Sequence, residues 1–232
     1  MDARDVAAFY ETPLGRRTAG VLQQSLDRLW PAMAGLSLLG IGHAGPYLEA
    51  WRRQARCVSL SPAEMGPAPW PASGPRLACL AETEALPFPD LCFDRILLVH
   101  GLEQAENARR MLREIWRVLK DDGRLIVVAP NRRGLWAYAE STPFGHGQPY
   151  SDGQLSRLLT GLFFRLEGRD AALYAPPIAA PAFLARMAER CGPSLAPRFA
   201  GLVIIEAAKA LHGMIPAGRR APSRRVLAED RI

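Results

Sequence analysis

A short apolar segment at residues 36–41 runs directly into a glycine-rich turn, with Gly40, Gly42 and Gly45 in the pattern GxGxxG. A strand that enters such a turn and leaves it as a helix is typical of open α/β sheets. Glycine lets the backbone there approach a bound ligand closely, because no Cβ stands between them. The pattern predicts a ligand site beside the turn, although a tight strand-to-helix connection alone would account for the same residues.

Helical and extended patterns alternate along the chain, as they do in α/β folds. Ser151 and Gln154 form a capping box, which begins a short helix that ends at Gly161. Residues 121–123 are expected to end an earlier helix. We therefore predict a doubly wound, three-layer Rossmann-like sheet of about seven strands. Strands are expected at 36–41, 56–60, 76–80, 93–99, 124–129, 163–166 and 202–208, and helices at 16–30, 46–54, 105–119, 151–160 and 181–190.

A chain of 232 residues can bury one full core. We predict a single domain over residues 1–212, in which residues 1–34 form an N-terminal helical cap. Residues 213–232 are rich in arginine and proline, which predicts a basic flexible tail. The five arginines and two acidic residues of this tail supply half of the formal net charge of +6. No aromatic residues alternate with these arginines, so the charge does not favour nucleic-acid binding.

Several classes of protein are not expected, because the sequence lacks their usual features. No apolar run reaches the roughly 18 residues of a membrane span, and the N-terminus does not resemble a secretory signal. The four cysteines include no C-x-x-C pair, which favours a reduced, cytoplasmic protein. The four histidines are not at metal-ligand spacing, so no metal site is expected.

Two downstream segments narrow the choice of family. Residues 86–94 read Leu-Pro-Phe, a gap, and Phe-Asp, and residues 112–123 read L-x-E-x-x-R-V-L-K-x-x-G. With the turn at 40–45, they resemble the core of class I S-adenosylmethionine-dependent methyltransferases of the small-molecule type. The resemblance implies mostly parallel strands with one antiparallel strand, S-adenosylmethionine as cofactor and a small-molecule methyl acceptor. A nicotinamide-dependent oxidoreductase would share the turn but would not explain the two downstream segments.

The resemblance also implies roles for individual residues. Glu82 and Thr83 would lie beside the adenine ring, although Glu84 is close enough in sequence to take the place of Glu82. His100 would lie near the sulfonium and the acceptor, where it is a candidate general base, and capping of strand carbonyls is the other role open to it. The candidate cofactor-binding residues are Gly40, Gly42, Gly45, Ser59, Glu82, Thr83 and His100.

The second strand departs from the family pattern. The family has an Asp or Glu there that binds both ribose hydroxyls, whereas this chain has Ser59 and Ser61, with Glu64 beyond Pro62. A hydrogen bond to a charged group contributes roughly 1.5–3 kcal/mol, so its loss would weaken cofactor binding about tenfold or more. A second hypothesis follows, in which the chain is a cofactor-weak or non-catalytic methyltransferase-fold protein that acts as a regulatory module with a protein partner.

Acceptor sites in the resembled family are built partly from the N-terminal segment and from the loop after the fifth strand. The corresponding loop at 136–150 is rich in aromatic rings suited to a flat acceptor, and a surface loop with buried aromatic residues is the competing interpretation. Methyl transfer needs mainly alignment and exclusion of water, so no catalytic triad is required. The candidate substrate-binding residues are Tyr10, Trp136, Tyr138, His146 and Tyr150.

Overall fold

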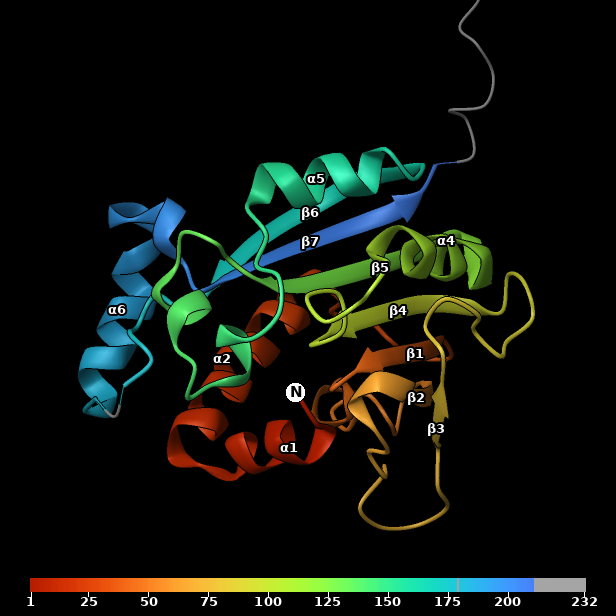
Figure 1. Ribbon diagram of the computed structural model, residues 1–232, viewed down its shortest axis with the longest axis horizontal. Coiled ribbons are helices and arrows are strands. Elements are labelled where there is room, and N and C mark those ends of the chain that lie inside the picture. The colour runs from red at the N-terminus through yellow and green to blue at the C-terminus, as the bar shows by residue number, and fades with distance from the viewer. Residues whose placement is uncertain (179, 211–232) are drawn as a thin grey trace, which may run out of the picture.

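Seven strands form one sheet in the structure, a computed structural model that describes residues 1–178 and 180–210 (Figure 1). The strands are β1 (Ser37–Gly42), β2 (Arg56–Pro62), β3 (Ala78–Ala81), β4 (Phe93–Val99), β5 (Leu119–Pro130), β6 (Phe164–Ala172) and β7 (Leu202–Lys209). Their order is β3-β2-β1-β4-β5-β7-β6. β7 runs antiparallel to both neighbours, whereas the other neighbouring pairs are parallel. The predicted fold is confirmed.

Helices cover both faces of this sheet, which makes three layers (Figure 1). The helices are α1 (Ala3–Glu11), α2 (Pro13–Leu29), α3 (Gly45–Leu48), α4 (Ala108–Val118), α5 (Asp152–Thr160) and α6 (Ala182–Leu195), with short 3₁₀ turns η1 (Ala63–Met65), η2 (Leu135–Tyr138), η3 (Pro143–Gly145) and η4 (Pro197–Phe199). Residues of α1, α2 and α3 pack on one face, and residues of α4 and α5 pack on the other. Figure 1 shows α6 at the end toward which the parallel strands point.

Successive residues of the central strands face opposite layers. In β4, Leu97 and Val99 pack in the same cluster as α2, whereas Ile96 and Leu98 pack in the cluster that contains α4. The near-continuous apolar runs in the sequence follow from this arrangement, because both faces of these strands are covered.

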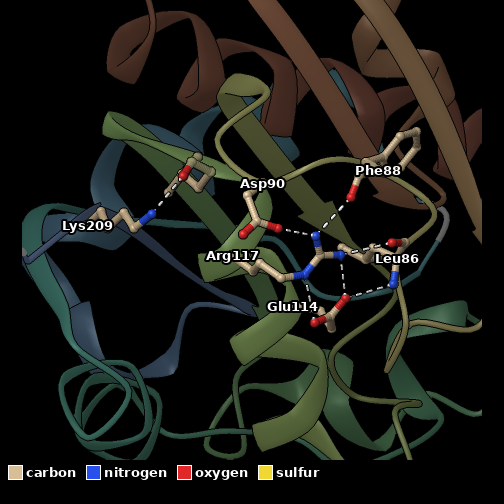
Figure 2. Close-up of polar contacts among 7 residues, drawn as sticks. Leu86, Phe88, Asp90, Glu114, Arg117 and Lys209 are labelled. Carbon is tan, nitrogen blue, oxygen red and sulfur yellow. Dashed lines mark hydrogen bonds and ion pairs between the residues drawn. The ribbon is translucent and has the colours of Figure 1, made fainter.

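The two segments at 86–94 and 112–123 are in direct contact in the structure (Figure 2). The Arg117 guanidinium of α4 donates to both carboxylate oxygens of Glu114, at 3.0 and 2.7 Å. It also donates to the carbonyl oxygens of Leu86 and Phe88, at 3.0 and 2.9 Å, and pairs with Asp90 at 2.7 Å. Glu114 in turn accepts from the N–H of Leu86 at 2.9 Å. α4 therefore fixes the loop between β3 and β4.

Asp94 ties three strands together at the amino end of the sheet. Its carboxylate accepts from the N–H and hydroxyl of Ser37 in β1, and from the ammonium of Lys120 in β5 at 2.8 Å. Burial alone would raise the pKa of Asp94, but the hydrogen bonds from Lys120 and Ser37 outweigh it and lower that pKa to about 2. Asp94 is thus a structural anchor of the sheet.

Several element boundaries differ from the sequence prediction, and β6 and α6 run on to Ala172 and Leu195, beyond the predicted ends at residues 166 and 190. Two further differences concern the end of α3 and the start of β5. α3 ends at Leu48, short of residue 54, and the chain continues in turns that lead into β2. Residues 121–123, expected to end a helix, lie within β5, which begins at Leu119 opposite Phe93. At Leu119 the pairing of β5 with β4 overrides the local helical spacing.

The predicted tail at 213–232, with residues 211 and 212, lies outside the described residues. Among the described helices, none combines the length and apolar character needed to cross a membrane.

Candidate functional site

The glycine turn lies where β1 and β4 end side by side. The two strands are parallel neighbours, and the N–H of His43 donates to the carbonyl oxygen of Val99 at 2.8 Å. Gly42 has a φ of 82°, and a Cβ on it would collide with that carbonyl oxygen. Glycine at position 42 is therefore required both by its backbone conformation and by the close approach of the two strand ends.

The other two glycines make room for α3 and for the loop after β2. A Cβ on Gly40 would lie 2.7 Å from the Cβ of Ala44, and a Cβ on Gly45 would lie 3.0 Å from Cδ1 of Trp70. Side chains of the protein itself thus fill the space directly over Gly40 and Gly45. Room for a ligand lies alongside the turn.

A cavity of about 390 Å³ opens there, and we call it the turn cavity. Its size lies within the range of about 300–1,000 Å³ that is usual for small-molecule sites. It brings Gly42 and Gly45 together with Ser59 of β2, so three candidate cofactor residues share one cavity. The lining comprises Gly42, His43, Gly45, Pro46, Glu49, Ser59 and residues 68–73.

Three side chains give the turn cavity its polar character. His43 is 8% exposed, and its Nε2 atom is buried without a hydrogen-bond partner among the described residues. Burial and the nearby His100 lower the pKa of His43 to about 3, so the ring is neutral. Ser59 is also buried, and Glu49 presents a carboxylate that pairs with Arg52 at 3.1 Å. A buried polar atom without a partner indicates a place for a ligand or a water molecule.

Next to the turn, four buried side chains form a series of hydrogen bonds that we call the buried relay. The Tyr47 hydroxyl donates to the Tyr10 hydroxyl at 3.0 Å, and the Tyr10 hydroxyl lies 2.8 Å from Nε2 of His100. Nδ1 of His100 lies 3.1 Å from the carboxylate of Glu103. Donation from Tyr47 to Tyr10, from Tyr10 to His100 and from His100 to Glu103 satisfies all three contacts. In that arrangement Glu103 holds the proton on Nδ1, and Nε2 is the acceptor.

Burial sets the protonation of the two phenols. It raises the pKa of Tyr10 well above its usual value, and Tyr47 and Glu103 raise it further. Burial likewise raises the pKa of Tyr47. Both hydroxyls therefore keep their protons and act as donors. The Tyr10 ring also stacks on His43, with centroids 5.0 Å apart, so the buried relay adjoins the turn cavity.

His100 stands at a strained position directly after β4. Its φ of 55° lies in the left-handed region, which costs a residue other than glycine roughly 1–3 kcal/mol. Such a conformation persists only where the surroundings impose it. Here both ring nitrogens of His100 are held by Tyr10 and Glu103, and the side chain is 1% exposed.

The residues expected beside the adenine ring lie apart from the turn cavity. Thr83 lines a separate cavity of only about 10 Å³, together with Glu64. Glu82 is exposed, whereas Glu84 pairs with Arg110 at 3.1 Å. Of the two alternatives for the adenine contact, Glu82 is thus the carboxylate without an ion-pair partner among the described residues.

The aromatic residues predicted to bind substrate do not converge in the structure. Trp136 is buried and donates to the carbonyl oxygen of Ala175 at 2.8 Å, whereas Tyr138 is 73% exposed. His146 bonds the carbonyl oxygen of Glu140. Tyr150 packs on the α4 side of the sheet, and Tyr10 and Trp136 pack on the other side. Only Tyr10 adjoins the turn cavity.

Sequence reasoning missed four residues of this region, His43, Glu49, Tyr47 and Glu103. His43 lies inside the glycine pattern, and Glu103 follows His100 by three residues, so both carried a positional signal. Tyr47 belongs to α3 and Glu49 to the turn after it, and nothing in their local sequence indicates a role in a site. Among the described residues, no cluster of three or more His, Cys, Asp or Glu side chains could hold a metal ion.

The sequence of this region is similar to known methyltransferases. Residues 38–127 match the family model described as a methyltransferase domain. A stretch of 48 residues is 48% identical to the ubiquinone/menaquinone biosynthesis C-methyltransferase UbiE of Enterobacter sp. (strain 638), and it covers 21% of this chain and 19% of that protein. The chain therefore matches about a fifth of the length of this curated relative.

The fold is similar to solved structures over most of the chain. A putative methyltransferase of Haloferax volcanii, solved in complex with the Trm112 methyltransferase activator, aligns with a TM-score of 0.64 at 16% identity, covering 90% of this chain and 95% of that one. A methyltransferase of Thermotoga maritima, described as a possible histamine N-methyltransferase, aligns with a TM-score of 0.61 at 17% identity over 89% and 95%. At these identities the similarity is one of fold.

Proposed function

We propose that the protein is a class I S-adenosylmethionine-dependent methyltransferase that transfers a methyl group to a small-molecule acceptor, and the match of residues 38–127 to the methyltransferase-domain family model supports this proposal. The turn cavity carries the proposal, because it joins the glycine turn to β2 at the carboxyl end of the sheet, where open α/β sheets bind ligands. The four cysteines are free, which supports a reduced, cytoplasmic location.

The side chains of the turn cavity fit this cofactor. Gly42 and Gly45 would lie along its methionine portion, and Ser59 and Glu49 offer oxygen atoms to its hydroxyl and amino groups. The unpartnered Nε2 of His43 would gain a hydrogen bond from the bound molecule. Glu49 would thus supply, from the end of α3, the carboxylate that β2 lacks.

S-adenosylmethionine, when bound, would supply a methyl group carried on a positively charged sulfur. The acceptor attacks that methyl carbon in line with the sulfur, which is the leaving group. The protein would contribute alignment and exclusion of water. Trp70 lines the turn cavity and is 7% exposed, and the Tyr10 ring covers His43. With the cofactor bound, these rings would shield that side of the site from water.

His100 is the proposed base for an acceptor that must lose a proton. Glu103 would keep the proton on Nδ1, which leaves Nε2 to accept one, as in hydrolase triads. Tyr10 occupies Nε2 in this structure. The acceptor hydroxyl would therefore displace the Tyr10 hydroxyl before its proton passes to His100.

Calorimetric titration of the full chain with S-adenosylmethionine and S-adenosylhomocysteine tests the proposal, with NADH as the control. We expect micromolar binding of both sulfur compounds and no binding of NADH. An absence of heat and of any thermal shift at millimolar S-adenosylmethionine would refute the proposed activity. A Glu82→Ala variant should bind more weakly, and unchanged binding would remove Glu82 from the adenine site.

A second candidate function is a methyltransferase-fold module with weak or no cofactor binding. The small volume beside Thr83 favours it, because about 10 Å³ cannot admit an adenine ring without movement of the surrounding side chains. Ser59 and Ser61 in β2 favour it as well, because neither can bind both ribose hydroxyls as the Asp or Glu of the family pattern does. The same titration separates the two functions.

We also propose that the protein has a protein partner. The similarity to a putative methyltransferase solved with its Trm112 activator supports this proposal. So does the exposure of large apolar side chains on α6, where Phe183 is 67% and Met187 is 55% exposed.

A further inference from the structure

A second cavity, of about 900 Å³, lies among the start of α5, β6, β7 and η4. Figure 1 shows this region at the end of the sheet near α6. It shares no lining residue with the turn cavity. We call it the arginine cavity, because four separate parts of the chain each contribute one arginine to it: Arg133 after β5, Arg157 in α5, Arg169 in β6 and Arg198 in η4.

The acidic side chains of the arginine cavity are already neutralised. Asp152 pairs with Arg169 at 2.7 Å, and Asp170 pairs with Arg28 of α2 at 2.7 Å. The remaining guanidinium groups form no ion pair with any described residue. These groups belong to Arg133, Arg157 and Arg198.

One buried side chain fixes the backbone at two of these arginines, whose own side chains are exposed. Asn131 is 6% exposed, and its amide donates to the carbonyl oxygens of Arg198 and Ala200 at 3.1 and 2.7 Å. Its amide oxygen accepts from the N–H of Arg133 at 3.1 Å. The backbone at both arginines is therefore fixed by the fold, so only their side chains remain to be ordered around a ligand.

We propose that the arginine cavity binds a small organic phosphate, with the phosphate group held by Arg133, Arg157 and Arg198. Guanidinium groups stay charged and donate paired hydrogen bonds to phosphate oxygens. A dianion also neutralises more of the unpaired positive charge than a monoanionic carboxylate does. The cavity is larger than a phosphate group, and the half-buried Tyr174 gives it a surface for an organic body. This proposal does not depend on the proposed methyltransferase activity.

Phenyl phosphate is the probe for this site, titrated calorimetrically into the full chain at low ionic strength. Benzoate and phenol are the matched monoanionic and neutral controls. Phenyl phosphate should bind more tightly than benzoate, phenol should not bind, and added salt should weaken the phosphate binding. The triple variant Arg133→Gln, Arg157→Gln, Arg198→Gln should lose affinity about tenfold or more.

Two controls separate loss of the site from loss of the fold. Arg109→Gln removes an exposed arginine of α4 and should bind phenyl phosphate with the same affinity as the wild-type protein. The triple variant should keep the thermal midpoint and the S-adenosylhomocysteine affinity of the unchanged protein. Phenyl phosphate that binds no better than phenol, or a triple variant with unchanged affinity, would overturn the proposal. Failure of S-adenosylhomocysteine to bind the unchanged protein would count only against the methyltransferase activity.

Discussion

The His43 imidazole is buried beside the glycine turn with a pKa lowered to about 3, by burial first and then by His100. In the unfolded chain the pKa of a histidine is about 6.5. Between these values the unfolded chain binds a proton that the folded protein does not. The stability contribution of His43 is therefore complete above pH of about 6.5 and is lost as the pH falls toward 3.

Lowering the pH from 7 to 5 should reduce the free energy of unfolding by about 2 kcal/mol through His43 alone. Urea unfolding at the two pH values measures this change. His43→Asn should lack it, whereas His146→Asn, at a partly exposed loop position, should retain it. Equal pH dependence in His43→Asn and the unchanged protein would contradict the burial of a neutral imidazole.

Glu49 is the carboxylate that lines the turn cavity. Glu49→Gln should weaken S-adenosylhomocysteine binding about tenfold, because a hydrogen bond to a charged acceptor is replaced by a neutral one. Calorimetry measures the affinity, and Glu106→Gln, at an exposed position before α4, is the matched control. An unchanged affinity in Glu49→Gln would place the cofactor carboxylate elsewhere.

Among individual residues, the sequence predicted that the glycine turn and Ser59 belong to one site, and the turn cavity contains Gly42, Gly45 and Ser59. It could not show why each glycine is needed, because the contacts involved are tertiary. The carbonyl of Val99 and the ring of Trp70 reach the turn from other parts of the chain.

Among the elements, α4 depends on Arg117 for its hold on the loop between β3 and β4 (Figure 2). Arg117→Ala should lower the free energy of unfolding by about 2–3 kcal/mol, since charged hydrogen bonds are lost and Glu114 keeps only the N–H of Leu86 as a partner. Arg113→Ala removes an exposed arginine from the same helix and should change stability by less than about 0.5 kcal/mol. Equal stability of the two variants in urea unfolding would contradict this role.

The docking of α1 depends on the hydroxyl of Tyr10, which connects this helix to His100 and Tyr47. Tyr10→Phe keeps the ring and removes both hydrogen bonds, so local opening of α1 should become about tenfold more frequent. Amide hydrogen exchange across residues 3–11 measures this change. Tyr138→Phe, at an exposed ring, should leave exchange in α1 unchanged. Unchanged exchange in Tyr10→Phe would show that the Tyr10 hydroxyl does not hold α1 in place.

Element boundaries were predictable where local chemistry decides them. The capping box of Ser151 and Gln154 begins α5, and Gly161 follows its last residue, both as predicted. The predicted boundaries at the end of α3 and at Leu119 were wrong, and at Leu119 strand pairing decides the boundary. Phe93 pairs with Leu119, and no pattern near Leu119 reveals that partner.

For the whole molecule, alternation predicted the fold class, and the family resemblance predicted the antiparallel strand that β7 provides. Neither could locate the arginine cavity. Its four arginines are spread along the chain from residue 133 to residue 198. They line one cavity only because β6 and β7 return alongside β5. The buried relay has the same origin, since it joins α1 to the end of β4.

A crystal structure of the protein with S-adenosylhomocysteine would show whether the turn cavity holds the methyl donor, as we propose. We expect density for the ligand in the turn cavity, within hydrogen-bond distance of Ser59 and Glu49 and with a new hydrogen-bond partner for Nε2 of His43. Ligand density at any other position, or a turn cavity without ligand in crystals grown at saturating S-adenosylhomocysteine, would contradict the proposal.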